Sequence, residues 1–414
     1  MSDLHALRIN GPRLLQRLKD LGQVGALEGG GTNRLALSDA DKAGRDWTVA
    51  QMLQLGMTVR TDAIGNVVAT YAGTDNLPPV MTGSHIDTVR TGGLYDGNYG
   101  VMAGLEVVAT LRGAGMRTRR PIQVAFFTNE EGARFQPDMM GSLVMVGGMP
   151  LDAALAVKAV DNGATVGDEL QRIGYAGSAP VGAPQVDSFV ELHIEQGPVL
   201  EQEGFQIGVV EGVQGICWME FTFDGTSNHA GTTPMALRHD AGMCAMRTAA
   251  FIAELVARYG ERQLGTVGAI TLKPNLINVI AAQAVMTVDL RNTDGAKLQQ
   301  AQAEVLAFAQ QVAADHGVQF AHRPLADFAP VAFDAGVVDS VEQHAQAQGL
   351  RTLRMPSGAG HDAQMLARVC PTAMVFVPSA GGLSHNVREH TDADQLEQGA
   401  NVLLQVLLER ANRI

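Results

Sequence analysis

The apolar positions along the chain follow two patterns, one helical and one strand-like. Residues 11–20 and 40–56 carry apolar side chains at helical spacing, for example Leu14, Leu15 and Leu18. Further on, short runs that are apolar on both faces, as in buried strands, alternate with helix-like stretches. The runs are residues 79–82, 122–128 (IQVAFFT), 189–194 and 372–377 (TAMVFV), and a helix is predicted at 99–111. This alternation predicts an α/β fold with a mainly parallel sheet and helices on both faces.

A middle segment has a different pattern. In residues 216–224 apolar side chains occupy every second position, which is typical of a strand with one buried face. The other predicted elements are helices at 240–259 and 295–316 and strands at 266–273, 284–291 and 319–323. The order β-α-β-β-α-β is that of a ferredoxin-like α+β sandwich. We therefore expect an inserted domain at 214–331, within a domain formed by 1–213 and 332–414.

Composition narrows the class of protein. A chain of 414 residues exceeds the size at which one hydrophobic core stops growing, which favours two domains. The net charge of −13 repels phosphate and anionic lipid, so nucleic acid and membranes are not expected partners. No apolar run approaches the roughly 18 residues of a membrane helix, and the first 20 residues lack a signal-peptide pattern. Three cysteines without a CxxC pair predict neither disulfides nor a thiolate zinc site. We expect a cytoplasmic protein.

Side chains that could bind metal follow the predicted strands. His85, Asp87 and Asp96 come after the first strand, Glu130 and Glu131 after the second, His193 near the end of the third, and His385 after the last. A single such residue is ordinarily a turn or capping residue. In open α/β sheets, however, ligands bind beyond the carboxyl ends of the strands, so these clusters should converge on one crevice.

These residue types suit a site for two metal ions. Such a site needs nitrogen and oxygen ligands and a carboxylate that bridges ions about 3.5–4 Å apart. The candidates are His85, Asp96, Glu131, His193 and His385, with Asp96 as the bridge. Asp87 is placed to accept the imidazole N–H of His85 and is counted among the catalytic residues. Glu130 and Glu131 are neighbours whose side chains diverge, so one can coordinate while the other acts as general base.

Several motifs resemble the amidase, hydantoinase/carbamoylase branch of the M20 metallopeptidase clan. They are residues 83–89 (GSHIDTV), 129–135 (NEEGARF), 191–197 (ELHIEQG), 228–235 (NHAGTTPM) and 357–363 (SGAGHDA). The resemblance covers nearly the whole chain. This branch contains N-carbamoyl-L-amino-acid hydrolases, allantoate amidohydrolases and β-ureidopropionases. Peptidase members of the clan usually have a carboxylate in place of His193, so the resemblance favours an amidohydrolase.

The resemblance also implies a set of roles. One metal would be held by His85, Asp96 and His193, and a second by Asp96, Glu131 and His385. Glu130 would be the catalytic acid/base. Two divalent ions per subunit are expected, and nitrogen and oxygen ligands suit zinc, manganese, nickel or cobalt. The inserted domain would act as a lid over the site and would build a homodimer.

The expected substrate contacts include an arginine of the inserted domain. Along 284–291, alternation places Arg291 on the face away from the apolar core, where its planar fork is free to grip a carboxylate. The resemblance implies that Arg291 and Asn278 hold the substrate α-carboxylate. It also implies that Gln196 and His229 contact the substrate, with His229 coming from either subunit. Backbone contacts are expected from Gly360, whereas His361 is a neighbour of the ligands or a substrate contact.

The expected reaction is hydrolysis of the ureido C–N bond of an N-carbamoyl-L-amino acid, giving the amino acid, CO₂ and ammonia. The substrate is thus a small molecule with a carboxylate and a ureido group. Allantoate amidohydrolase and β-ureidopropionase are the alternatives. A non-enzymatic binding protein on the same fold would have lost a metal ligand or the base, and all six positions are filled here.

Overall fold

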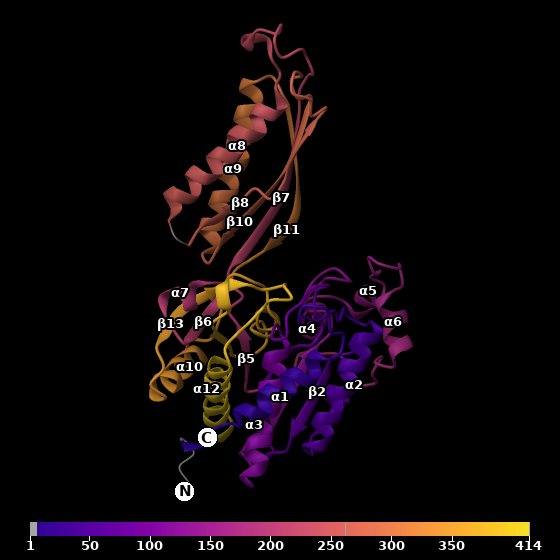
Figure 1. Ribbon diagram of the computed structural model, residues 1–414, viewed down its shortest axis with the longest axis vertical. Helices are drawn as coiled ribbons and strands as arrows, with labels where there is room; N and C mark the ends of the chain where they lie inside the picture. The colour runs from indigo at the N-terminus through magenta and orange to yellow at the C-terminus, as the bar shows by residue number, and fades with distance from the viewer. Residues whose placement is uncertain (1–5, 261, 414) are drawn as a thin grey trace. The chain divides into compact units, whose positions relative to one another are not determined.

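The computed structural model describes residues 6–260 and 262–413. The chain divides into two compact units (Figure 1). The larger unit extends to Glu211 and resumes at Ala332, and the smaller unit spans Gly212–Val331. In the part of the chain that the structure describes, no helix combines the length and apolar character needed to cross a membrane.

A nine-stranded sheet forms the centre of the larger unit. Its order is β1-β2-β4-β3-β5-β14-β6-β12, with β13 paired to β6. The central pairs β4–β3, β3–β5 and β5–β14 are parallel, whereas the outer pairs β1–β2, β2–β4 and β14–β6 are antiparallel. The strands are β1 (Thr58–Thr61), β2 (Val67–Tyr71), β3 (Val80–His85), β4 (Ile122–Phe127), β5 (Ser188–Ile194), β6 (Ile207–Val213), β12 (Val331–Ala332), β13 (Thr352–Ser357) and β14 (Thr372–Val377).

The central strands have an apolar sequence because both of their faces are covered. Every residue of β3, β5 and β14 is buried. α3 packs against β3 and β5, and α10 and α12 pack against β14. The helices are α1 (Gly11–Gly22), α2 (Asp39–Gln54), α3 (Asn98–Gly113), α4 (Met140–Met145), α5 (Leu151–Leu155), α6 (Val166–Ile173), α7 (Val199–Glu203), α10 (Ala335–Ala347), α11 (Asp362–Leu366) and α12 (Ala393–Asn412), with a 3₁₀ turn η3 at Ala380–Gly382. The predicted α/β fold is confirmed.

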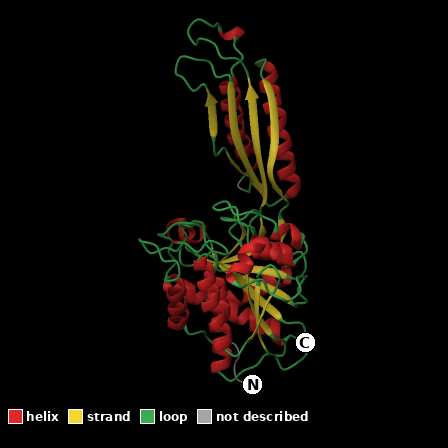
Figure 2. Cartoon of the chain, turned by 90° about the vertical axis from the view of Figure 1, so that its right-hand side faces the viewer, coloured by secondary structure: helices red, strands yellow, loops and turns green. Residues whose placement is uncertain are grey.

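The smaller unit is an antiparallel sheet with two helices on one face (Figure 2). The sheet order is β11-β7-β10-β8, and β9 also pairs with β10. The buried side chains of β7 and β10 face α8 and α9 and form a separate core. The elements are β7 (Gly215–Asp224), η2 (Met235–Leu237), α8 (Ala241–Tyr259), β8 (Leu264–Thr266), β9 (Ile270–Lys273), β10 (Gln283–Asn292), α9 (Gly295–Asp315) and β11 (Gln319–Phe328). Their order confirms the predicted α+β arrangement.

Two strands of this unit differ from their predicted extents. The strand predicted at 266–273 is split, because Thr266 pairs with Asp289 while Ile270 pairs with Met286, so three residues face two across a bulge. β11 continues five residues beyond the predicted end at Arg323. The next residue is Pro324, which cannot donate a ladder hydrogen bond, and the register shifts there before pairing resumes.

Candidate metal centre

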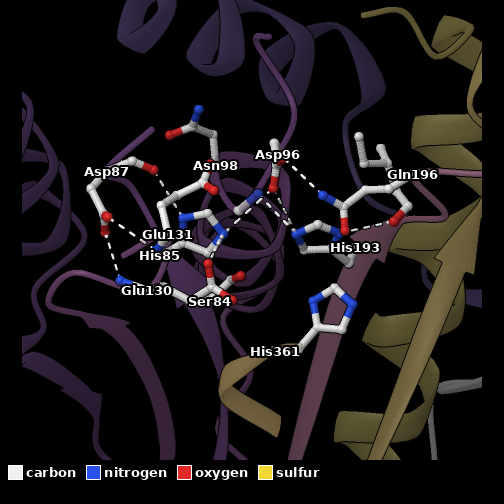
Figure 3. A network of polar contacts seen from close by, with 12 residues as sticks. Ser84, His85, Asp87, Asp96, Asn98, Glu130, Glu131, His193, Gln196 and His361 are labelled. Atoms are coloured by element: carbon white, nitrogen blue, oxygen red, sulfur yellow. Dashed lines mark hydrogen bonds and ion pairs between the residues drawn. The ribbon is translucent and has the colours of Figure 1, made fainter. Parts of the chain in front are cut away.

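Five side chains expected to bind metal meet in the larger unit. Figure 3 shows four of them, His85, Asp96, Glu131 and His193. His85 ends β3, His193 lies near the end of β5, Glu131 follows β4 and His385 follows β14, while Asp96 lies in the turn before α3. Two groups of potential ligand atoms result, His85 with Asp96 and His193, and Asp96 with Glu131 and His385. Within each group the ligand atoms lie within 4.8 Å of one another. Four strand ends and one turn, far apart in the sequence, therefore share one location.

Asp96 lies between the two groups. Its Oδ1 is 3.5 Å from Nε2 of His85 and 3.2 Å from Nε2 of His193, whereas its Oδ2 is 3.3 Å from Nε2 of His385. Burial raises the pKa of Asp96, but the nearby imidazoles of His193, His385 and His85 outweigh it and hold the pKa well below its usual value. The carboxylate is thus ionised, with one oxygen turned to each group, as a bridging ligand requires.

The neighbouring glutamates point to different partners. Oε2 of Glu130 is 3.3 Å from Nε2 of His85, and Oε2 of Glu131 is 3.2 Å from Nε2 of His385. Burial raises the pKa of Glu130 well above its usual value, against the attraction of His85 and with added repulsion from Asp362 and Glu131. A buried carboxyl group with a raised pKa beside the ligand cluster is suited to accept and return a proton.

Backbone carbonyls orient two of the imidazoles. Nδ1 of His85 lies 2.9 Å from the carbonyl oxygen of Asp87, and Nδ1 of His193 lies 2.8 Å from that of Ile194. Because a carbonyl only accepts, each Nδ1 carries a proton, which leaves the lone pair of each Nε2 for a metal when the ring is neutral. In His193 that lone pair also accepts the N–H of Gly97 at 3.0 Å.

The carboxylate of Asp87 does not contact His85 as expected. The acceptor is the backbone carbonyl of Asp87, because the chain turns at the end of β3 and directs the carboxylate toward the loop after β4. There it accepts the N–H groups of Glu130 and Glu131 at 3.3 and 3.4 Å. Asp87 therefore holds the glutamate pair in place, and it contacts His85 only through its backbone.

The donor atoms fit divalent cations. Nε2 of His85 is buried without a hydrogen-bond partner among the described residues, as an unused metal ligand would be. Burial lowers the pKa of His85, but Glu130, Asp96 and Asp87 raise it well above its usual value, and hydrogen bonds to Asp96 and Glu131 raise the pKa of His385 to about 10. The nearby carboxylates create a negative potential that raises the pKa of these imidazoles, and the same potential attracts metal cations.

A cavity of about 120 Å³ adjoins the cluster, and three further residues considered in the sequence line it. Nε2 of Gln196 donates to Oδ2 of Asp96 at 2.9 Å, while its Oε1 has no partner in the described chain. Gly360 forms a wall, and a Cβ there would lie 2.8 Å from the terminal methyl carbon of Met139. His361 lines the cavity and also packs edge-to-face on His193, with ring centroids 4.6 Å apart.

The remaining expected contacts belong to the smaller unit. His229 and Asn278 are both exposed and lie side by side, since the N–H of Ala230 donates to the carbonyl of Asn278. Arg291 is not free as expected. Its Nε and Nη2 atoms lie 2.9–3.2 Å from the carboxylate of Asp289, and its guanidinium is 5.9 Å from the ring centre of Trp218.

Asn278 and Arg291 are not brought together within one chain. Asn278 precedes β10, which begins at Gln283, and Arg291 lies eight residues further along that strand. At a rise of about 3.3 Å per residue, the segment of β10 from Gln283 to Arg291 spans about 25 Å, and Asn278 lies before that segment. The expectation that both hold one carboxylate therefore fails for a single copy of the smaller unit.

The sequence pattern did not assign several residues that support the cluster. Glu191, buried within β5, accepts the hydroxyl of Ser84 at 2.6 Å and the N–H of Ala363 at 2.8 Å. A carboxylate inside an otherwise apolar strand was the available signal.

Two residues that the sequence did assign, Gln196 and His385, have left-handed backbones, with φ of 58° and 54°. Such conformations are costly for residues other than glycine and recur at functional sites, but the sequence does not reveal them.

Comparisons with known proteins identify relatives of this chain. The family described as Peptidase family M20/M25/M40 matches residues 81–409. The chain is 40% identical to an N-carbamoyl-L-amino-acid amidohydrolase of Rhizobium meliloti, over 98% of this chain and 97% of that protein. It is 34% identical to an allantoate amidohydrolase of Bacillus subtilis, over 94% and 95%. A solved amidase of the hydantoinase/carbamoylase family from Burkholderia multivorans matches with a TM-score of 0.96 at 44% identity, covering 99% of both chains.

The named activities of these relatives concern C–N bonds outside peptides, and the family is metal-dependent. The ligand groups of the larger unit are consistent with such chemistry. The chain therefore belongs to the M20/M25/M40 family and, within it, to the hydantoinase/carbamoylase amidases, as an amidohydrolase that acts on C–N bonds other than peptide bonds.

Proposed function

We propose that the protein hydrolyses N-carbamoyl-L-amino acids with the help of two divalent cations. The observation that supports the chemistry is the position of Asp96, whose two oxygens face two separate ligand groups beside Glu130. The similarity to the Rhizobium meliloti amidohydrolase over nearly the full length of both chains supports the substrate class.

The two ligand groups define where the cations would bind. His85, Asp96 and His193 would hold one, and Asp96, Glu131 and His385 the other. Zinc, manganese, nickel and cobalt all suit such nitrogen and oxygen donors. When bound, the pair would supply Lewis-acid activation of water and of the ureido carbonyl.

Glu130 would move the proton. Its carboxylate accepts a proton from the attacking water, whose oxygen bonds to the ureido carbon. The bond between that carbon and the amino-acid nitrogen then breaks, and Glu130 returns the proton to this nitrogen. The carbamate released decomposes to CO₂ and ammonia. The raised pKa of Glu130, caused first by burial, suits a group that must hold the proton between the two steps.

Arg291 would bind the substrate carboxylate through its planar fork, in place of or beside Asp289. Because Asn278 lies about 25 Å or more from Arg291 along the sheet, we propose that Asn278 and His229 act from a second copy of the chain. The smaller unit would then serve as both lid and dimerisation domain. We also propose a cytoplasmic location, consistent with the free cysteines Cys217, Cys244 and Cys370.

A substrate panel tests the proposal. The purified protein is stripped with a chelator, reloaded with each metal in turn, and assayed with N-carbamoyl-L-methionine, N-carbamoyl-β-alanine, allantoate and ureidoglycolate. We expect activity only after reloading and the highest kcat/KM with N-carbamoyl-L-methionine. N-carbamoyl-D-methionine is the control for the L configuration. A higher kcat/KM with allantoate would reject the substrate class and leave the amidohydrolase chemistry standing.

A further inference from the structure

A buried carboxylate that the proposed mechanism does not use lies behind Asp96. Glu389 follows His385 by four residues, and only 6% of its surface is exposed. Its Oε1 accepts the N–H groups of Tyr95 at 3.0 Å and of Asp96 at 3.2 Å. One side chain therefore grips the backbone of the turn that presents Asp96, although Tyr95 and Glu389 are 294 residues apart in the sequence.

The other oxygen of Glu389 faces the loop that carries His385. Oε2 of Glu389 lies 3.3 Å from the hydroxyl of Ser384, which in turn lies 3.2 Å from Oδ2 of Asp96. Gln196 donates to both Ser384 and Asp96, at 3.1 and 2.9 Å. Oδ2 of Asp96 is also the atom that faces His385, so the network ends at the second ligand group.

The surrounding backbone fits closely around this carboxylate. A Cβ on Gly93 would lie 2.0 Å from Oε1 of Glu389, so the turn before Asp96 can approach it only with glycine at that position. Backbone hydrogen bonds from Glu389 to Asn386 and from Ala380 to His390 hold the loop itself. Hence the reach of the Glu389 side chain determines how far apart the Asp96 turn and the His385 loop lie.

We propose that Glu389 is a positioning residue that holds Asp96 against His385 and so sets the geometry of the cation site formed by Asp96, Glu131 and His385. Its contribution is the length and accepting capacity of its side chain. The inference rests on the proposed two-metal function. Groups that orient metal ligands from outside the coordination shell typically change metal affinity by about 10- to 100-fold when mutated.

Three substitutions of Glu389 distinguish the effect of side-chain length from the effect of charge. Glu389→Gln keeps the reach and an accepting oxygen but removes the charge, Glu389→Asp keeps the charge but shortens the side chain by one methylene, and Glu389→Ala removes both. Isothermal titration of chelator-stripped protein with Mn²⁺ measures the stoichiometry and affinity of each cation. Asp62→Asn is the matched control, since the buried Asp62 carboxylate accepts the N–H groups of Ile64 and Asn66 and none of its hydrogen bonds reaches the five ligands.

The proposal predicts that Glu389→Asp and Glu389→Ala weaken the binding of one cation by about 10- to 100-fold. Glu389→Gln and Asp62→Asn should bind both cations like the wild type. Equal weakening in Glu389→Gln and Glu389→Ala would overturn the proposal in favour of a charge effect, and unchanged binding in Glu389→Asp would overturn it outright. If Glu389→Ala does not fold, the Gln and Asp variants still decide. A wild type that binds fewer than two cations would instead reject the proposed function.

Discussion

The two units present their candidate residues in opposite ways. In the larger unit the ligand cluster is mostly buried, each side chain has a defined partner, and Asp96 faces three imidazoles. In the smaller unit His229 and Asn278 are exposed, and Arg291 lies far along the same sheet with Asp289 as its partner. The comparison indicates that one unit preorganises the candidate metal ligands by itself, whereas the proposed substrate contacts would need a further component to complete them.

The difference has a physical origin. A metal site must hold several like charges close together, which is stable only when backbone carbonyls and outer carboxylates constrain the ligands, as the Glu389 carboxylate constrains Asp96 by accepting its N–H. A surface that admits and releases substrate must stay accessible to solvent. The two regions therefore respond differently to substitution, and the following experiments test that contrast.

The largest expected effect is that of Glu130→Gln. The substitution leaves the metal ligands in place but removes the group that transfers the proton, so kcat should fall by about 10²- to 10⁴-fold, the usual contribution of general acid–base catalysis. Elemental analysis should find the same metal content as in the wild type. Retained turnover would remove Glu130 from its proposed role.

Next comes a pair of glycine substitutions, one in each unit. Gly97 has a φ of 64°, and a Cβ there would lie 2.4 Å from the His85 imidazole, so Gly97→Ala should displace a ligand and weaken metal binding by about 10- to 100-fold. Gly268 has open space around it beyond the Thr287 hydroxyl at 3.4 Å, and Gly268→Ala should bind metal normally. Metal titration of both variants measures the contrast, which equal affinities would contradict.

Arg291→Lys should have an intermediate effect. Lysine keeps the charge but loses the planar fork, so KM should rise roughly tenfold while kcat changes little, as expected for a charge-assisted hydrogen bond. Steady-state kinetics with N-carbamoyl-L-methionine provide the measurement, and Arg323→Lys, a substitution at an exposed ion pair with Glu220, serves as the control. An unchanged KM would reject the carboxylate assignment.

The smallest change, relative to the wild type, is expected when two defective chains are combined. If His229 acts across a dimer, co-expressed Arg291→Ala and His229→Ala chains should recover about a quarter of wild-type activity, because half of the dimers are mixed and each has one intact site. The pair His229→Ala and Asn278→Ala should not recover, since both residues belong to the same contributed segment. No recovery in the first pair would show that the smaller unit acts on its own chain, and recovery in the second pair would show that His229 and Asn278 serve different sites.

Much of this protein follows from local sequence. Apolar runs such as 189–194 and 372–377 predict the buried strands, because burial on both faces favours apolar side chains at most positions of the run. The same strands have ligand-type residues at their ends, and the fold class then implies that these residues meet at one edge of the sheet. The alternation of apolar and polar residues in 284–291 also predicted that Arg291 lies on the face of the strand away from the apolar core, as the structure shows.

Other features depended on tertiary contacts that leave no local pattern. The Asp87 carboxylate accepts the N–H of Glu130 instead of that of the His85 imidazole, Gln196 donates to Asp96, and Glu389 reaches the backbone of Asp96. Periodicity reports only whether a position is buried, because neighbours in sequence share a strand or a helix face. The partner of a polar atom is instead set by which distant segments the fold brings within about 3 Å, and that depends on turns and loops whose geometry the sequence pattern does not specify.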